Sequence, residues 1–173
     1  MRLGDGVEWT LHCCSVLAAL PEGTAVPAAD LATFHGVPPA YLAKQLQALS
    51  TAGIVTTHRG RRGGYRLGRR PDQITLLDVV LAVDGDETAF RCSEIRQRGP
   101  SAVPAERYVR PCGIARRMRA AEQAWRDELA ATSLADLTAE LDASVDPEQI
   151  ERAIEWLAAT VTLPVPGSDT EET

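Results

Sequence analysis

The stretch YLAKQLQALSTAGIVTTHRGRRGGYRL, residues 41–67, joins a helix-forming segment to two short strand-forming runs. Its leucines recur at helical spacing, which predicts a helix with one buried face that ends at Gly53. The runs 54–59 and 65–67 are rich in β-prone residues and flank RGRRGG, which predicts a hairpin with a glycine-rich tip. The stretch therefore predicts a helix followed directly by a basic hairpin.

Two further helices precede this stretch, and their order indicates the fold. Residues 5–20 carry apolar side chains at helical spacing, and residues 27–35 form a second, shorter helical segment before Gly36. Helix, short helix, helix and basic hairpin is the order of a winged helix-turn-helix, in which the third helix enters the major groove of DNA. We therefore expect such a DNA-binding domain over residues 1–84.

The remainder of the chain is predicted to be helical around one irregular loop. A helix at 74–83 precedes a loop at 85–111 that is rich in turn residues. A long helix follows, and 112–163 is expected to hold dimerisation and C-terminal helices before a disordered tail at 164–173. The long helix carries an apolar stripe that predicts pairing with a second copy, giving a homodimer. The stripe consists of Ile114, Met118, Ala121, Trp125 and Leu129. The fold class is mostly α with a small β-hairpin wing.

Charge is distributed unevenly along the chain. The formal net charge is −6, yet residues 1–70 contain eight Lys and Arg against four Asp and Glu. A basic region of this kind is an electrostatic footprint for double-stranded DNA, and a two-fold dimer would read a roughly palindromic operator. The alternative for RGRRGG is a solvated, flexible basic loop. The predicted DNA contacts are Tyr41, Lys44 and Gln45 in the major groove, with Arg59, Arg61 and Arg62 on the backbone or minor groove.

Composition and motifs exclude several classes of protein. No run of about 18 apolar residues is present, and Glu8 with His12 interrupts any secretion signal, so a cytoplasmic location with no membrane partner is expected. We find no nucleotide-binding loop, HExxH or nucleophile motif, which argues against an enzyme. Four cysteines in a reducing compartment are expected to be free, redox-active or metal-bound.

The first helix contains GVEWTLHCC, residues 6–14, which raises a question of chemistry. Glu8 and His12 are four apart, so both side chains share one face and can reach a single metal; an exposed helix pair is the alternative. Cys13 and Cys14 point away from that face, and Cys14 falls on the apolar stripe. Both are expected to be core thiols, as buried free cysteines commonly are.

Several motifs together resemble a known family. YLAKQLQALSTAGIV, RGRRGGYRL and ITLLDVVLAVDG are similar to the winged-helix transcription regulators of the IscR and NsrR family, over residues 1 to about 141. The resemblance implies a homodimer in which helix 112–131 packs against its partner. It also implies an iron–sulfur cluster-binding loop at 85–111. Members of this family usually offer three closely spaced cysteines there, whereas this chain has Cys92 and then only Cys112.

The shortage of cysteines matches an unusual branch of that family, the RsrR type. VEW and LHCC at 7–14, FRCSEIRQRGP at 90–100 and PCGIAR at 111–116 resemble its motifs. The resemblance implies a redox-sensing regulator with a [2Fe–2S] cluster bridging the dimer. Glu8 and His12 of one subunit and Cys92 and Cys112 of the other would be its ligands. Two alternatives stay open: a thiol switch between the two cysteines, or a zinc site built from the same four residues.

Overall fold

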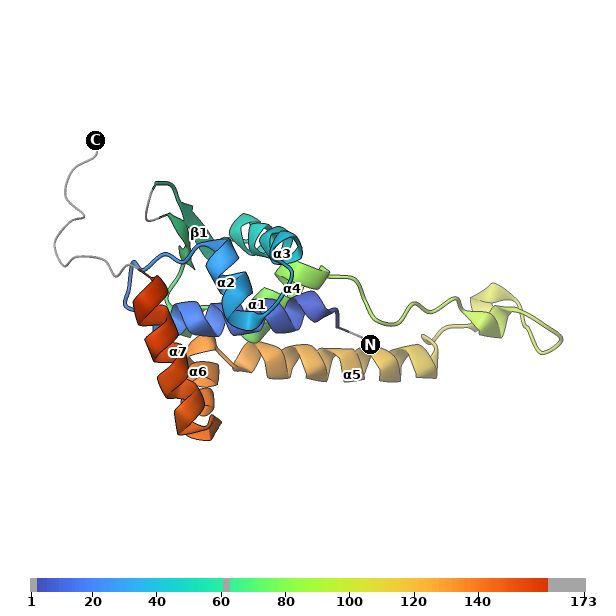
Figure 1. The fold of residues 1–173 in the computed structure, drawn as a ribbon. Helices are drawn as coiled ribbons and strands as arrows, with labels where there is room; N and C mark the ends of the chain where they lie inside the picture. The colour runs from blue at the N-terminus through green and yellow to red at the C-terminus, as the bar shows by residue number, and fades with distance from the viewer. Residues whose placement is uncertain (1–2, 61–62, 162–173) are drawn as a thin grey trace.

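The computed structural model describes residues 3–60 and 63–161 of the 173-residue chain (Figure 1). Its main elements, in chain order, are α1 (Asp5–Ala19), α2 (Ala28–His35), α3 (Pro39–Thr51), β1 (Val55–His58), β2 (Gly64–Leu67), α4 (Leu76–Asp84), α5 (Gly113–Ala131), α6 (Leu134–Ser144) and α7 (Pro147–Thr160). Short 3₁₀ turns lie at η1 (Pro71–Gln73), η2 (Ile95–Gln97) and η3 (Ala105–Arg107). The mostly helical fold with a two-stranded antiparallel wing is confirmed.

The core lies between α1, α2, α3, the hairpin and α4. Its leucines include Leu42, Leu46 and Leu49, the stripe that predicted α3, and each is 0% exposed. Leu134 at the start of α6 and Val161 after α7 join the same buried cluster. The C-terminal helices therefore complete the core of the winged helix rather than forming a second one.

The wing pairs with a third segment that precedes α2. Val26 exchanges backbone hydrogen bonds with Tyr65 at 2.9 and 2.8 Å. This pairing brings the two backbones close together at Gly64, where an added Cβ would lie 2.3 Å from the Val26 carbonyl carbon. Such a distance excludes any larger residue, so one glycine of the predicted hairpin tip is required for packing rather than for the turn alone.

Helices α4 and α6 begin side by side. Thr75 caps α4 in a reciprocal capping box with Asp78, and Ser133 caps α6 in the same way with Asp136. The two capping residues also face each other in an isolated antiparallel bridge. Because α5 ends at Ala131, two residues before Ser133, this paired cap fixes the C-terminal end of α5 against the core.

The loop at 85–111, which we call the arm, extends away from the core beyond the far end of α5 (Figure 1). At its base, Arg126 of α5 forms ion pairs with Asp86 of the arm and with Glu122. Helix α5 is exposed along most of its length in the single chain, and of its residues only Ala115 is buried. Ile114 and Met118, from the predicted dimer stripe, are 67% and 44% exposed.

Candidate functional site

Helix α3 presents a polar face to solvent. Tyr41 is 47% exposed, and Lys44 and Gln47 are exposed further along the helix. Ala40, Lys44, Gln47 and Thr51 form the outermost row, since they recur every three to four residues. Gln47 was not among the predicted contacts, although its spacing from Lys44 was a usable signal.

The other predicted DNA contacts differ in their placement. Gln45 is only 8% exposed, because its amide group packs against Gly6 of α1, where an added Cβ would lie 2.9 Å away. In this conformation it does not face outward, and a role in reading bases requires its side chain to turn. Arg59 is exposed at the end of β1, whereas Arg61 and Arg62 lie outside the described residues.

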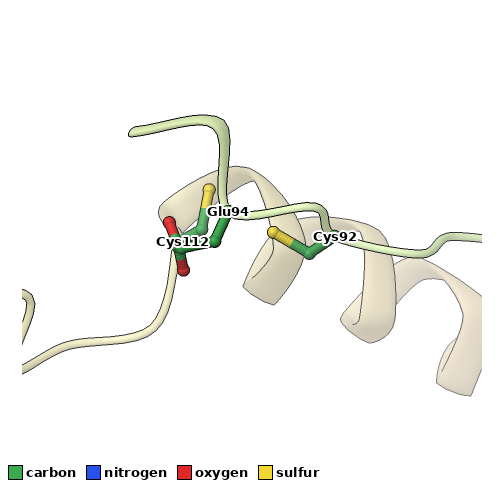
Figure 2. A group of neighbouring side chains, drawn as sticks. All are labelled: Cys92, Glu94 and Cys112. Carbon is green, nitrogen blue, oxygen red and sulfur yellow. The ribbon is translucent and has the colours of Figure 1, made fainter. Parts of the chain in front are cut away.

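The second candidate site lies where the arm meets α5. The ligand atoms of Cys92, Glu94 and Cys112 all lie within 4.8 Å of one another. Figure 2 shows the Cys92 sulfur directed toward the other two side chains. Two sulfur atoms bound to one tetrahedral metal are about 3.8 Å apart, given metal–sulfur bonds of about 2.3 Å. Two thiols within 4.8 Å of each other are near enough to reach one metal centre together.

Cys112 is the N-cap residue of α5, and this position explains its chemistry. The nearby backbone N–H groups of Ala115 and Ile114 hold the pKa of the Cys112 thiol below its usual value, with smaller contributions from Arg96 and Cys92. A helix N-terminus favours the thiolate, which is the form that binds metals. Cys112 is 8% exposed, whereas Cys92 and Glu94 are partly exposed, so the site is open to water on one side.

Glu94 and Arg96 also lie at this site, and neither was predicted as a site residue from the sequence. Glu94 has a φ of 48°, in the left-handed region, and its carboxylate accepts a hydrogen bond from the Arg96 guanidinium. That bond is the main cause holding the pKa of Glu94 below its ordinary value. The available signal was the short spacing of an acid and a base after Cys92 in FRCSEIRQRGP.

Glu8 and His12 lie elsewhere in the chain, on the exposed side of α1. The His12 ring lies 5.7 Å from the ring of His35 at the end of α2. Burial, followed by the proximity of His12, lowers the pKa of His35 to about 4, and its Nε2 is buried without a hydrogen-bond partner. Trp9, the residue after Glu8, meets the ring of Tyr41 on α3 edge-on, with 5.1 Å between the ring centroids.

Cys13 and Cys14 are core thiols, as predicted. Both are 0% exposed, and burial raises the pKa of Cys13 to about 12 and that of Cys14 still further. A thiol that resists deprotonation is a poor nucleophile and a poor metal ligand. Their adjacency in the sequence therefore does not make them a metal site.

Comparison with known proteins shows to which family the chain belongs. Residues 3–140 match the model of the Rrf2 family, described as an iron-dependent transcriptional regulator. A Mycobacterium tuberculosis protein named as an HTH-type transcriptional regulator is 31% identical over 140 residues, covering 79% of this chain and 81% of that protein. Protein aau3 of Rhizobium meliloti is 37% identical over 138 residues, covering 79% and 84% respectively.

Solved structures show the same fold at lower identity. IscR of T. potens superposes with a TM-score of 0.64 at 18% identity, covering 87% of this chain and 96% of its own. CymR, the global cysteine regulator of B. subtilis, gives a TM-score of 0.60 at 24% identity, covering 81% and 98%. Among the residues that the structure describes, no helix has both the length and the apolar character needed to cross a membrane.

Proposed function

The chain belongs to the Rrf2 family of iron-dependent transcriptional regulators, and from that premise we propose that it is a redox-sensing regulator with a [2Fe–2S] cluster at its dimer interface. Family membership places it among DNA-binding transcription regulators rather than enzymes. The observation that carries the proposal is the pairing of Cys92 with Cys112 across the arm. We further propose a homodimer that acts in the cytoplasm on a roughly palindromic operator.

The ligand set follows the RsrR-type motifs. Each iron of a [2Fe–2S] cluster takes two protein ligands, and the two thiols of the arm supply one such pair. Glu8 and His12 of the partner subunit would supply the other, since they are exposed and share one face of α1. A bound [2Fe–2S] cluster supplies one-electron redox chemistry. A carboxylate and an imidazole in place of two thiolates make the two irons electronically distinct.

The connection to DNA runs through α1 in this proposal. Trp9 follows the ligand Glu8 directly and contacts Tyr41 on the exposed face of α3. A change in the position of Glu8 would therefore displace Trp9 and, through it, Tyr41 on α3, the helix proposed to enter the major groove. Tyr41 and Lys44 would contact bases, Gln45 would do so after turning outward, and Arg59 with Arg61 and Arg62 would contact the backbone or minor groove.

A zinc site is the second candidate. The close approach of Cys92, Glu94 and Cys112 also suits a single divalent ion, because zinc accepts both thiolate and carboxylate ligands. A reversible disulfide between the two cysteines would be the metal-free variant of this regulator.

One experiment separates these candidates. The protein is purified without oxygen, and its visible spectrum, iron, sulfide and zinc contents are measured before and after dithionite. Bleachable absorption with equal iron and sulfide supports the cluster. Stoichiometric zinc without absorption would replace the proposal by the zinc regulator. Binding to a duplex selected from a random pool, compared between the two redox states, then tests the sensing role.

A further inference from the structure

Arg96 occupies the centre of the folded end of the arm. Its Nε donates to the carboxylate of Glu94, and its Nη2 donates to the backbone carbonyl of Arg110 at 3.1 Å. The guanidinium carbon also lies over the ring of Tyr108, 5.2 Å from its centroid. One side chain therefore makes contact with both the outgoing and the returning segment of the arm.

These contacts lie next to both cysteines. Glu94 is two residues after Cys92, and Arg110 is two residues before Cys112. The hydroxyl of Tyr108 adds a further link between the two segments by donating to the backbone carbonyl of Arg96. We call these contacts of Arg96 and Tyr108 the bracket. The same hydroxyl accepts a hydrogen bond from the backbone N–H of Val103 at 3.0 Å. The arm contains no regular sheet or long helix between the cysteines, so few other contacts hold its two segments in register.

Arginine is suited to this place in a way that lysine is not. Its planar fork donates in two fixed directions at once and stacks on an aromatic ring, whereas a lysine ammonium offers a single mobile point charge. The guanidinium is also bound to the carboxylate of Glu94, an oxygen of which lies within 4.8 Å of the sulfur atoms of both Cys92 and Cys112, so a cation lies near both thiols. A cation there attracts negative charge on these sulfurs.

We propose that Arg96 is the positioning residue of the cysteine pair: its contacts hold the two segments of the arm together so that both sulfurs face one centre. Its positive charge also stabilises negative charge on the two sulfurs and on the group that they bind. The placement of the thiols holds whatever they bind. The effect on a bound cluster rests on the proposed function.

The first test uses metal-free protein. Reduced protein is treated with diamide, a diazene that takes up the two electrons and two protons released when Cys92 and Cys112 form a disulfide. Cys13→Ala and Cys14→Ala are built into every variant so that only this pair reacts. Arg96→Met and Arg96→Lys should both slow the reaction about tenfold, because lost positioning lowers the effective concentration of one thiol at the other.

Two variants control this measurement. Arg98→Met, an exposed neighbour in the same loop, should react at the unmodified rate. Tyr108→Phe removes the closing hydroxyl without changing any charge and should be slowed in the same direction as Arg96→Met. Circular dichroism checks folding, and Tyr108→Phe carries the test if Arg96→Met does not fold. Equal rates in the bracket variants and in Arg98→Met would overturn the positioning role.

The second test measures the midpoint potential of cluster-loaded protein. Removing a nearby cation makes the addition of an electron less favourable, so Arg96→Met should have a lower potential than Arg98→Met. Arg96→Lys should stay near the unmodified potential while still failing the disulfide test. Equal potentials in Arg96→Met and Arg98→Met would overturn the role of the charge. Absence of any chromophore in the unmodified protein would reject the proposed cluster. The disulfide test would still show whether Arg96 positions the two cysteines.

Discussion

The four cysteines occupy two regions that give the same side chain opposite chemistry. Cys13 and Cys14 lie in the core of the winged helix, where burial raises the pKa of both thiols. Cys92 and Cys112 lie where the arm meets α5, and the N–H groups of the first turn of α5 lower the pKa of the Cys112 thiol. Both Cys14 and Cys112 are buried.

The depth of burial and the groups around the sulfur together decide whether a thiol is inert. What differs is the set of groups around the sulfur: apolar side chains for Cys14, and oriented N–H donors with a guanidinium for Cys112. We expect substitutions in the core to change stability with little effect on metal binding. Substitutions in the arm and along α5 should do the reverse.

The largest effect is expected at the cysteines themselves. Cys112→Ala or Cys92→Ala should abolish the visible chromophore, because two ligands of one iron are needed to hold it. Cys14→Ala should retain the chromophore and lower the free energy of unfolding by about 1–2 kcal/mol through the cavity left behind. Spectra and urea unfolding of the three variants test this division. Loss of the chromophore in Cys14→Ala with retention in Cys112→Ala would reverse the comparison.

The exposed stripe of α5 should control assembly. Replacing Ile114 and Met118 together by glutamate places two charges in the expected dimer interface, where an unpaired charge is strongly unfavourable. The variant should sediment as a monomer at micromolar concentration, keep the far-ultraviolet spectrum of the unmodified protein, and lose its cluster. Glutamate at Arg116 and Arg117, two exposed positions on the same helix, is the matched control. A dimeric double variant would remove α5 from the interface.

On the winged-helix body, the exposed face of α3 should affect DNA binding without affecting the cluster. Lys44→Ala should weaken operator binding by about 1–3 kcal/mol if it reads a base, and Arg59→Ala should reduce the salt dependence of binding by about one unit. Binding is measured by fluorescence anisotropy over a salt series. Arg152→Ala on α7, far along the chain from both elements, should match the unmodified protein. No change in either variant would contradict the proposed interface.

The smallest expected effect is the loss of stability at acid pH that comes from His35. Its folded pKa of about 4 lies below the usual value of 6.5, so between these values the unfolded chain binds a proton that the folded chain does not. The free energy of unfolding should therefore fall as the pH drops from about 6.5 toward 4, by about 1–2 kcal/mol for a partly exposed ring. His35→Gln should lose this acid sensitivity. Urea unfolding of metal-free protein at pH 7 and pH 5 measures the difference, with the exposed His58→Gln as control.

Much of the fold was predictable because its signals are local. The leucine spacing of α3, the Ser133 cap and the paired runs of the hairpin each depend on neighbours within one or two turns. The apolar position of Cys14 on its helix likewise predicted its burial. Such patterns depend on periodicity alone, which a single sequence displays directly.

The rest depends on contacts between distant segments. Polar spacing suggested an outward Gln45, but Gly6 on α1 leaves room for its amide against the backbone, and nothing in α3 itself reveals that space. The left-handed turn at Glu94 and the bracket of Arg96 depend on the return of the arm from Tyr108. Whether Glu8 and His12 meet the cysteines of another subunit stays a prediction, since it involves a second chain.

The paired caps of α4 and α6 hold one end of α5, so a tilt of this helix about that end moves its other end the most. Its C-terminal end is clamped at the Thr75 and Ser133 bridge, while Cys112 is at its opposite, N-terminal end. Nineteen residues of helix span about 28 Å. A tilt of about 5° at the clamp would move the sulfur-bearing end by about 2.5 Å, close to the length of one metal–sulfur bond. Conversely, a displacement of about 1 Å at Cys112 would tilt α5 by only a few degrees about its C-terminal end, where the helix joins the winged-helix body.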